Sequence, residues 1–203
     1  MTNFIDGGVC AAQGFRAAGI HVGVKTHAEW KKDVALIVSD TDCTAAALFT
    51  KNVVKAAPIQ VDIQHLADGK ARAIIANSGN ANACAPQGEE NAKRICAAAA
   101  QAIGCKPEDV LVSSTGVIGQ RINVEAIEAG IPALYDALER SDEASDAAGH
   151  AIMTTDTLKK EAAGETIVGG KTVRIGGIAK GSGMIHPNMG TMLCFLTTDC
   201  AIS

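Results

Sequence analysis

The sequence predicts a mixed α/β protein, and three observations support this fold class. Short apolar runs of strand length recur along the chain, one alanine-rich segment has the pattern of a helix, and Gly169-Gly170 has the composition of a hairpin turn. Of the 203 residues, 47% are hydrophobic and 20% are charged, which is normal for a chain with a sizeable buried core. We expect one domain over residues 1–203.

The predicted elements follow in chain order. Apolar runs predict strands at residues 34–38, 45–49, 72–76, 110–114, 171–178 and 192–197. Residues 89–103 form the strongest predicted helix, because the segment is rich in alanine and Gly104 can end it in a left-handed conformation. Shorter helices are predicted at 124–129, 132–138 and 144–152. The polar interval 139–143 is expected to be a surface loop.

Charge and composition exclude several classes of protein. The net charge is −4, aromatic residues make up 3% of the chain, and no basic cluster is present, so we expect no nucleic-acid partner. Asn3, Asp6 and Gly7 interrupt any apolar start, which argues against a secretory leader, and no apolar run is long enough to cross a bilayer. We therefore expect a cytoplasmic protein with no membrane partner.

Cysteine and histidine spacing does not favour a metal or disulfide framework. The seven cysteines contain no CxxC pair, their number is odd, and most lie among apolar or small residues, so we expect reduced thiols. The histidines are scattered without the spacing of metal ligands: His21, His27, His65, His150 and His186. No metal and no bound cofactor are expected.

The most informative feature is the Gly190-Thr191 bond, which directly precedes a predicted strand. A small residue followed by threonine at the start of a buried strand is the arrangement of a nucleophile released by self-cleavage. Cleavage would free the α-amino group of Thr191, whose ordinary pKa of about 7.7 to 8.0 lets it act as the base that a threonine hydroxyl otherwise lacks. Gly190 tolerates the backbone conformations that this cleavage requires. The alternative is an ordinary Pro-Asn-x-Gly turn that leads into a strand.

A second segment points to the same chemistry. The predicted strand at 110–114 is followed by Thr115 and Gly116. A hydroxyl beside a glycine amide at a strand end can supply two donors to a developing alkoxide, as in an oxyanion hole. The alternative is a plain turn from a strand to a helix.

Together these segments resemble the ornithine acetyltransferase family, the bifunctional ArgJ proteins of arginine biosynthesis. The resemblance extends over nearly the whole chain, at residues 14–20 (GFRAAGI), 49–52 (FTKN), 56–58 (AAP), 77–84 (NSGNANAC), 114–119 (STGVIG), 153–157 (MTTDT), 180–185 (KGSGMI) and 187–193 (PNMGTML). So many matches in register are more specific than any one short motif. The resemblance implies a layered α/β sandwich similar to DmpA-type N-terminal-nucleophile proteins, with the nucleophile at the start of a central strand.

The resemblance also implies roles for individual residues. Thr191 matches the nucleophile that accepts the acetyl group, and Thr115 with Gly116 matches the oxyanion hole. Thr154 and Lys180, together with Thr191, match positions that contact substrate, and a cationic Lys180 suits the carboxylate of an N-acetylated amino acid. Without the resemblance, Lys180 is interpreted as a solvated turn lysine and Thr154 as the first residue of a helix.

The implied reaction is acetyl transfer from N2-acetylornithine to glutamate through an acetyl-enzyme, with autocatalytic cleavage of the precursor. Acetyl-CoA is a possible co-substrate for N-acetylglutamate synthesis, although no residue indicates it independently. The implied partner is the β chain of the same precursor, in an α2β2 heterotetramer. The α chain is expected to end at Gly190, so residues 191–203 would be the first residues of the β chain.

One position departs from the family pattern, since Gly190 replaces the more frequent alanine, and we expect self-cleavage to persist because both residues are small. If Thr191 keeps its peptide bond to Gly190, it has no free amine and cannot act as described. Two other classes stay open. An N-terminal-nucleophile hydrolase, such as an aminopeptidase or amidase, would use the same groups but release the acyl group to water. A non-catalytic subunit is the third possibility.

Overall fold

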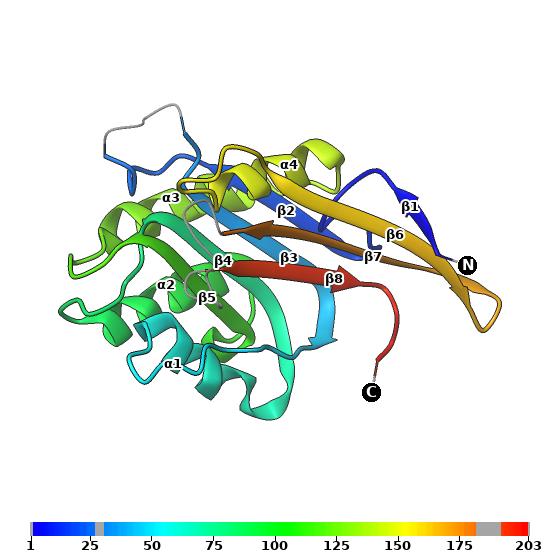
Figure 1. Cartoon of the computed structure of the whole chain (residues 1–203). Coiled ribbons are helices and arrows are strands. Elements are labelled where there is room, and N and C mark those ends of the chain that lie inside the picture. Colours follow the sequence, from blue (N-terminus) through cyan, green and yellow to red (C-terminus); the bar gives the residue numbers. More distant parts are fainter. Residues whose placement is uncertain (1, 27–30, 182–191, 203) are drawn as a thin grey trace.

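The computed structural model describes residues 2–26, 31–181 and 192–202, and within them the strands form two four-stranded sheets (Figure 1). The first sheet contains, in spatial order, β2 (Phe15–Ile20), β3 (Val34–Thr44), β4 (Lys70–Asn80) and β5 (Val110–Val117). The second contains β1 (Asn3–Ile5), β6 (Lys160–Val168), β7 (Lys171–Lys180) and β8 (Leu193–Thr198). The predicted α/β fold class is confirmed.

Helices and sheets are stacked in layers (Figure 1). One core lies between the first sheet and the helices α1 (Ala57–His65), α2 (Gly88–Ile103) and α3 (Val124–Asp136). A second core lies on the opposite face of that sheet, where α4 (Asp142–Ala151) and the second sheet pack against it. Ile178 of β7 and Phe195 of β8 are buried in this second core. The first sheet is therefore covered on both faces.

Strand direction places particular residues at one edge of the first sheet. β2, β3 and β4 are antiparallel, whereas β4 and β5 are parallel, and α2 lies in the connection between them. A parallel pair needs such a crossover, and it brings the carboxyl ends of both strands to the same edge. The ends of β4 and β5 are thus neighbours, with Gly79 paired to Gly116.

Most of the predicted elements are confirmed. Five of the six predicted strands correspond to β3, β4, β5, β7 and β8, although β8 begins one residue later than predicted, and Gly169-Gly170 joins β6 to β7 as a hairpin. The long helix is α2, which ends at Gly104 with a φ of 81°. The predicted strand at 45–49 is wrong: this segment has no regular structure, and Leu48 is 89% exposed. Pairing of β3 to β4 ends at Thr44, so an apolar composition alone did not make a strand there.

Two helical predictions also need correction. The predicted helices at 124–129 and 132–138 are one helix, α3, which contains Pro132. Buried Ile131 and Leu134 on either side of that proline anchor the helix to the core, so packing outweighs the local cost of the ring. The loop predicted at 139–143 is shorter than expected, because Ser141 caps α4 and the helix begins one residue later. The sequence did not predict β1, β2, β6 or α1.

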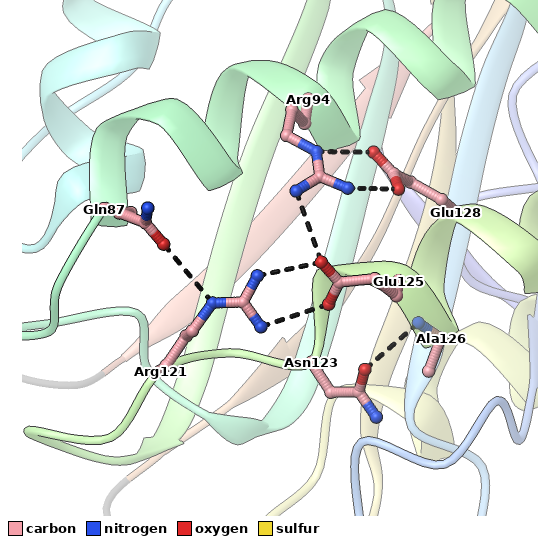
Figure 2. A network of polar contacts seen from close by, with 7 residues as sticks. All are labelled: Gln87, Arg94, Arg121, Asn123, Glu125, Ala126 and Glu128. Atoms are coloured by element: carbon pink, nitrogen blue, oxygen red, sulfur yellow. Dashed lines mark hydrogen bonds and ion pairs between the residues drawn. The ribbon is translucent and has the colours of Figure 1, made fainter.

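A network of ion pairs joins α2 to α3 (Figure 2). The Arg94 guanidinium lies 2.6 Å from a Glu128 oxygen and 3.3 Å from Glu125, which also receives hydrogen bonds of 2.8 and 3.1 Å from Arg121. The hydrogen bonds from Arg121 are the main reason that the pKa of Glu125 falls to about 2. Because Arg121 belongs to the loop after β5, the network attaches that loop to the helix layer.

Candidate active site

The site begins with two glycines at the ends of β4 and β5. Gly79 and Gly116 are paired across the parallel strands, with φ values of 107° and 135° that side chains rarely adopt. A Cβ on Gly116 would lie 2.6 Å from the carbonyl oxygen of Gly79 and from the amide nitrogen of Asn80. Only glycine lets the two backbones approach this closely. The predicted turn directly after residue 114 is wrong, because β5 continues through Gly116 to Val117 and still pairs with β4 there.

Buried polar side chains hold the paired ends of β4 and β5 from the side of the helices. Ser114 Oγ donates a hydrogen bond of 2.6 Å to Asn77 Oδ1, and Asn77 Nδ2 donates one of 2.9 Å to the Asn80 carbonyl. All three residues are buried. Because buried polar groups are costly when unpaired, these bonds fix the register irregularity that β4 shows at Asn80.

Thr115 points the other way, toward the second sheet. Side chains alternate along a strand, so Ser114 and Thr115 lie on opposite faces of β5. The same alternation on β7 puts Lys180 on the face of the buried Ile178. Lys180 Nζ lies 3.0 Å from Thr115 Oγ1 and donates a hydrogen bond to it. Two residues that the sequence singled out from different regions are therefore in direct contact, one from each sheet.

This contact is buried and includes a charged group. Thr115 is 2% exposed and Lys180 5% exposed, so the interpretation of Lys180 as a solvated turn lysine is wrong. Burial lowers the pKa of Lys180 below its ordinary value, and nearby Lys160 acts in the same direction, while the negative charge of Asp156 opposes the shift. The protonated lysine must be the donor in this hydrogen bond, because an ammonium group has no lone pair with which to accept one.

The segment between α4 and β6 carries the third predicted residue. Thr154 is half-buried and lies beyond the end of α4, so it does not begin a helix. Asp156 Oδ1 accepts hydrogen bonds from Lys160 Nζ at 2.7 Å and from the Gly181 amide at 3.0 Å. The backbone of Thr154 also helps to lower the pKa of Asp156, so Asp156 lies between Thr154 and the residue that follows Lys180.

Asp156, Lys25 and Asp33 are site residues that sequence reasoning missed. Lys25 Nζ donates to the Met153 carbonyl at 3.0 Å, and burial is the main reason that its pKa falls to about 8. Asp33 is fully buried and accepts hydrogen bonds from the amides of Val22 and Lys25. A signal for Asp156 was its place inside the quoted segment 153–157, where it is the one charged residue.

The predicted cleavage site, Gly190 and Thr191, lies outside the described residues. The strand that follows it is described: β8 begins at Leu193 and pairs antiparallel with β7, with Leu193 opposite Lys180. The chain therefore re-enters the second sheet beside the lysine that contacts Thr115.

Other expectations concern metals, membranes and thiols. Among residues 2–26, 31–181 and 192–202, no three His, Cys, Asp or Glu side chains are grouped closely enough to hold a metal ion. His27 and His186 lie outside those ranges. In the same part of the chain no helix has the length and apolarity to span a bilayer. The seven cysteines, all described, are free thiols.

Two stacked sheets with a buried lysine and threonine at the end of a parallel strand pair define a layered α/β protein with a candidate oxyanion-binding site. The chain belongs to the ArgJ family, whose model matches residues 16–203. The family prediction from the sequence is confirmed.

Curated relatives carry the name arginine biosynthesis bifunctional protein ArgJ. The protein from Symbiobacterium thermophilum is 49% identical over 200 residues, which are 98% of this chain and 49% of the relative. The one from Synechococcus is 52% identical over 202 residues, which are 98% of this chain and 48% of the relative. The chain thus spans about half the length of these curated relatives.

Solved structures of two relatives have the same fold. A crystal structure of the ArgJ protein from Bacillus halodurans has a TM-score of 0.85 and 41% identity, and the match covers 95% of this chain and 100% of that one. The ornithine acetyltransferase from Mycobacterium tuberculosis, crystallised with ornithine, has a TM-score of 0.84 and 37% identity with the same coverage.

Proposed function

We propose that this chain forms half of an acyltransferase of arginine biosynthesis, which transfers an acetyl group from N2-acetylornithine to glutamate. Membership of the ArgJ family and the ornithine bound to the relative from Mycobacterium tuberculosis support the substrates. The observation that carries the proposal is the buried contact between Lys180 and Thr115 at the end of a parallel strand pair. It brings a cation and the proposed oxyanion donor together beside the strand that follows Thr191.

The proposed reaction has two halves. The hydroxyl of Thr191 gives its proton to the α-amino group of the same residue and attacks the acetyl carbonyl, whose oxygen becomes an alkoxide. The Thr115 hydroxyl and the Gly116 amide donate hydrogen bonds to this oxygen. The alkoxide collapses, the bond to the amine of ornithine breaks, and the α-ammonium returns the proton to ornithine. The amine of glutamate then attacks the acetyl-threonine, and the bond between the acetyl carbon and the Thr191 oxygen breaks. The proton lost by that amine passes through the α-amino group to the Thr191 oxygen, which yields N-acetylglutamate and restores Thr191.

Lys180 and Thr154 take the role of substrate contacts in this proposal. The buried ammonium of Lys180 suits a carboxylate, since charge-assisted hydrogen bonds are strong where water is excluded. Acetyl-CoA is included as a second possible acetyl donor. We propose no metal and no bound cofactor, because the transfer needs only a nucleophile, a base and oxyanion donors.

The proposed partner is the downstream half of the same precursor, released by cleavage between Gly190 and Thr191. The solved chains are matched over their whole length by this chain, whereas the curated relatives are about twice as long, which supports division of a precursor near this point. The outward face of the second sheet is also apolar, because exposed Phe4, Ile175 and Leu196 lie on it. Such a face favours a protein partner. An α2β2 assembly in the cytoplasm completes the proposal.

The test uses the full-length precursor, including its downstream half, and a Thr191→Ala variant. Intact-protein mass spectrometry is expected to find two wild-type chains, the second beginning at Thr191, and one uncut chain for the variant. Native mass spectrometry of the cleaved protein measures the assembly. A break at another bond, or a break that persists in the variant, would remove Thr191 from the mechanism.

A second measurement separates transfer from hydrolysis. The cleaved enzyme is incubated with acetyl-labelled N2-acetylornithine, with and without glutamate, and in parallel with labelled acetyl-CoA. We expect label in N-acetylglutamate and little free acetate. Release of acetate at the same rate with and without glutamate would favour the hydrolase instead.

A further inference from the structure

We infer that Lys180 is the charged element of the oxyanion hole: it donates to the Thr115 oxygen, so that the Thr115 proton points toward the reacting carbonyl oxygen, and Asp156 positions and supports this lysine. The inference rests on the proposed function and adds a role to Lys180 beyond contact with a substrate carboxylate. It also makes Asp156 a positioning residue.

The direction of the hydrogen bond is the first step of the argument. A hydroxyl has one proton and two lone pairs, whereas an ammonium has three protons and no lone pair. In the 3.0 Å contact, Lys180 Nζ must therefore donate and Thr115 Oγ1 must accept. The Thr115 proton is left free for another acceptor, which is what an oxyanion-hole donor requires.

Polarisation is the second step. A hydroxyl that accepts a hydrogen bond from a cation becomes a stronger donor, because hydrogen bonds in a chain reinforce one another at low dielectric. Both side chains are almost fully buried, so bulk water does not screen this effect. Lys180 thus raises the donor strength of Thr115, an effect that needs no direct contact between Lys180 and the reacting carbonyl.

The charged groups around Lys180 explain the role of Asp156 in this inference. Asp156 is the anion that acts on Lys180, whereas Lys160 and Lys25 are the neighbouring cations. Its side chain is 1% exposed. Lys160 and the Gly181 amide hold Oδ1, while buried Oδ2 has no hydrogen-bond partner among the described residues. Burial pushes the pKa of Asp156 upward, but these donors outweigh it, so the carboxylate stays charged and favours the ammonium form of Lys180.

A double-mutant cycle distinguishes this role from substrate binding. The full-length precursor carries Lys180→Met, Thr115→Val or both, and mass spectrometry first establishes that each variant is cleaved. Removal of one oxyanion donor typically lowers kcat about 100-fold, so we expect that loss for Thr115→Val. Lys180→Met is expected to lower kcat about 10-fold by itself, and the double variant to be within about twofold of Thr115→Val.

Matched controls lie at the opposite end of the same sheet. Thr44 and Lys70 are exposed and paired across β3 and β4, so Thr44→Val and Lys70→Met repeat the same chemical changes away from the site. Neither control is expected to change kcat.

The outcomes distinguish a failure of this inference from a failure of the proposed function. If Thr115→Val leaves kcat unchanged, Thr115 is not an oxyanion donor, and the proposed function loses that assignment. If Thr115→Val lowers kcat but the two losses multiply in the double variant, the oxyanion hole stands and the coupling to Lys180 is wrong. A Lys180→Met variant that changes only KM overturns the inference in the same way.

Asp156→Asn gives an independent test if Lys180→Met does not fold or is not cleaved. Deprotonated Lys180 would accept the Thr115 proton and withdraw it from the site, so kcat should fall at alkaline pH. Loss of the Asp156 charge lowers the pKa of Lys180 further, because an anion stabilises the ammonium. We expect the alkaline limb of the pH profile to move to lower pH while the acid limb, set by the Thr191 amine, stays in place. An unmoved alkaline limb would contradict the inference.

Discussion

Replacement of Gly116 by alanine should destabilise the protein strongly, although alanine keeps the amide that the proposed oxyanion hole uses. Two costs combine at this position. A φ of 135° is a conformation that costs a residue with a side chain about 1–3 kcal/mol. The new Cβ would also lie 2.6 Å from backbone atoms of Gly79 and Asn80, which cannot rotate away, and such overpacking costs about 1–3 kcal/mol. We expect a loss of about 3–5 kcal/mol in the free energy of unfolding.

The matched control is Gly119→Ala in the following loop. Gly119 has a φ of 82°, and a Cβ there would meet no atom within 4 Å, so the variant carries strain without a clash. We expect it to cost about 1 kcal/mol. Guanidinium unfolding of the two variants and of the wild-type full-length protein measures the difference. If both variants unfold at the same denaturant concentration, the close approach of β4 and β5 at Gly116 is not what excludes a side chain.

Three further predictions concern buried groups. Burial raises the pKa of Asp62 from 3.8 to about 7, so the unfolded chain loses this proton before the folded protein does. Stability should therefore fall by about 4 kcal/mol at most as the pH rises from about 4 to about 7, and Asp62→Asn should flatten that dependence in unfolding curves recorded across this range. Ser114→Ala leaves the buried Asn77 oxygen without its donor and should cost about 1–3 kcal/mol of unfolding free energy. A denaturant midpoint equal to that of the wild type would contradict this expectation. Under native conditions an alkylating reagent should label exposed Cys84 before buried Cys96, whose pKa is raised by burial, and peptide mass spectrometry would reveal the reverse order if the packing were wrong.

The sequence predicted best those elements whose signal is local. The strand at 110–114 and the helix at 89–103 follow from apolar runs and from Gly104, and both are present. The apolar run at 45–49 failed because a strand also needs a partner, which β4 no longer offers beyond Thr44. Whether Pro132 ends a helix depends on its buried neighbours, which composition does not reveal.

The residues of the candidate site were likewise predicted only in part. Thr115 and Lys180 were named from motifs, and the structure adds the contact between their side chains. Their roles in the reaction remain predictions. Asp156 and Lys25 escaped notice because their importance comes from burial and from hydrogen bonds to distant backbone groups. Such contacts depend on how the two sheets are stacked, and no spacing along the chain encodes that arrangement.

The hydrogen bond between Lys180 and Thr115 also makes the site sensitive to the volume of the side chains between the two sheets. Each of its two ends belongs to a different sheet, so its length depends on the distance between the sheets. Buried side chains such as Ile178 and Phe195 occupy the core between those sheets. A change of one methylene there, remote from any substrate, would alter the strength of the Thr115 donor. Selection on catalytic rate would then act on the size of core residues.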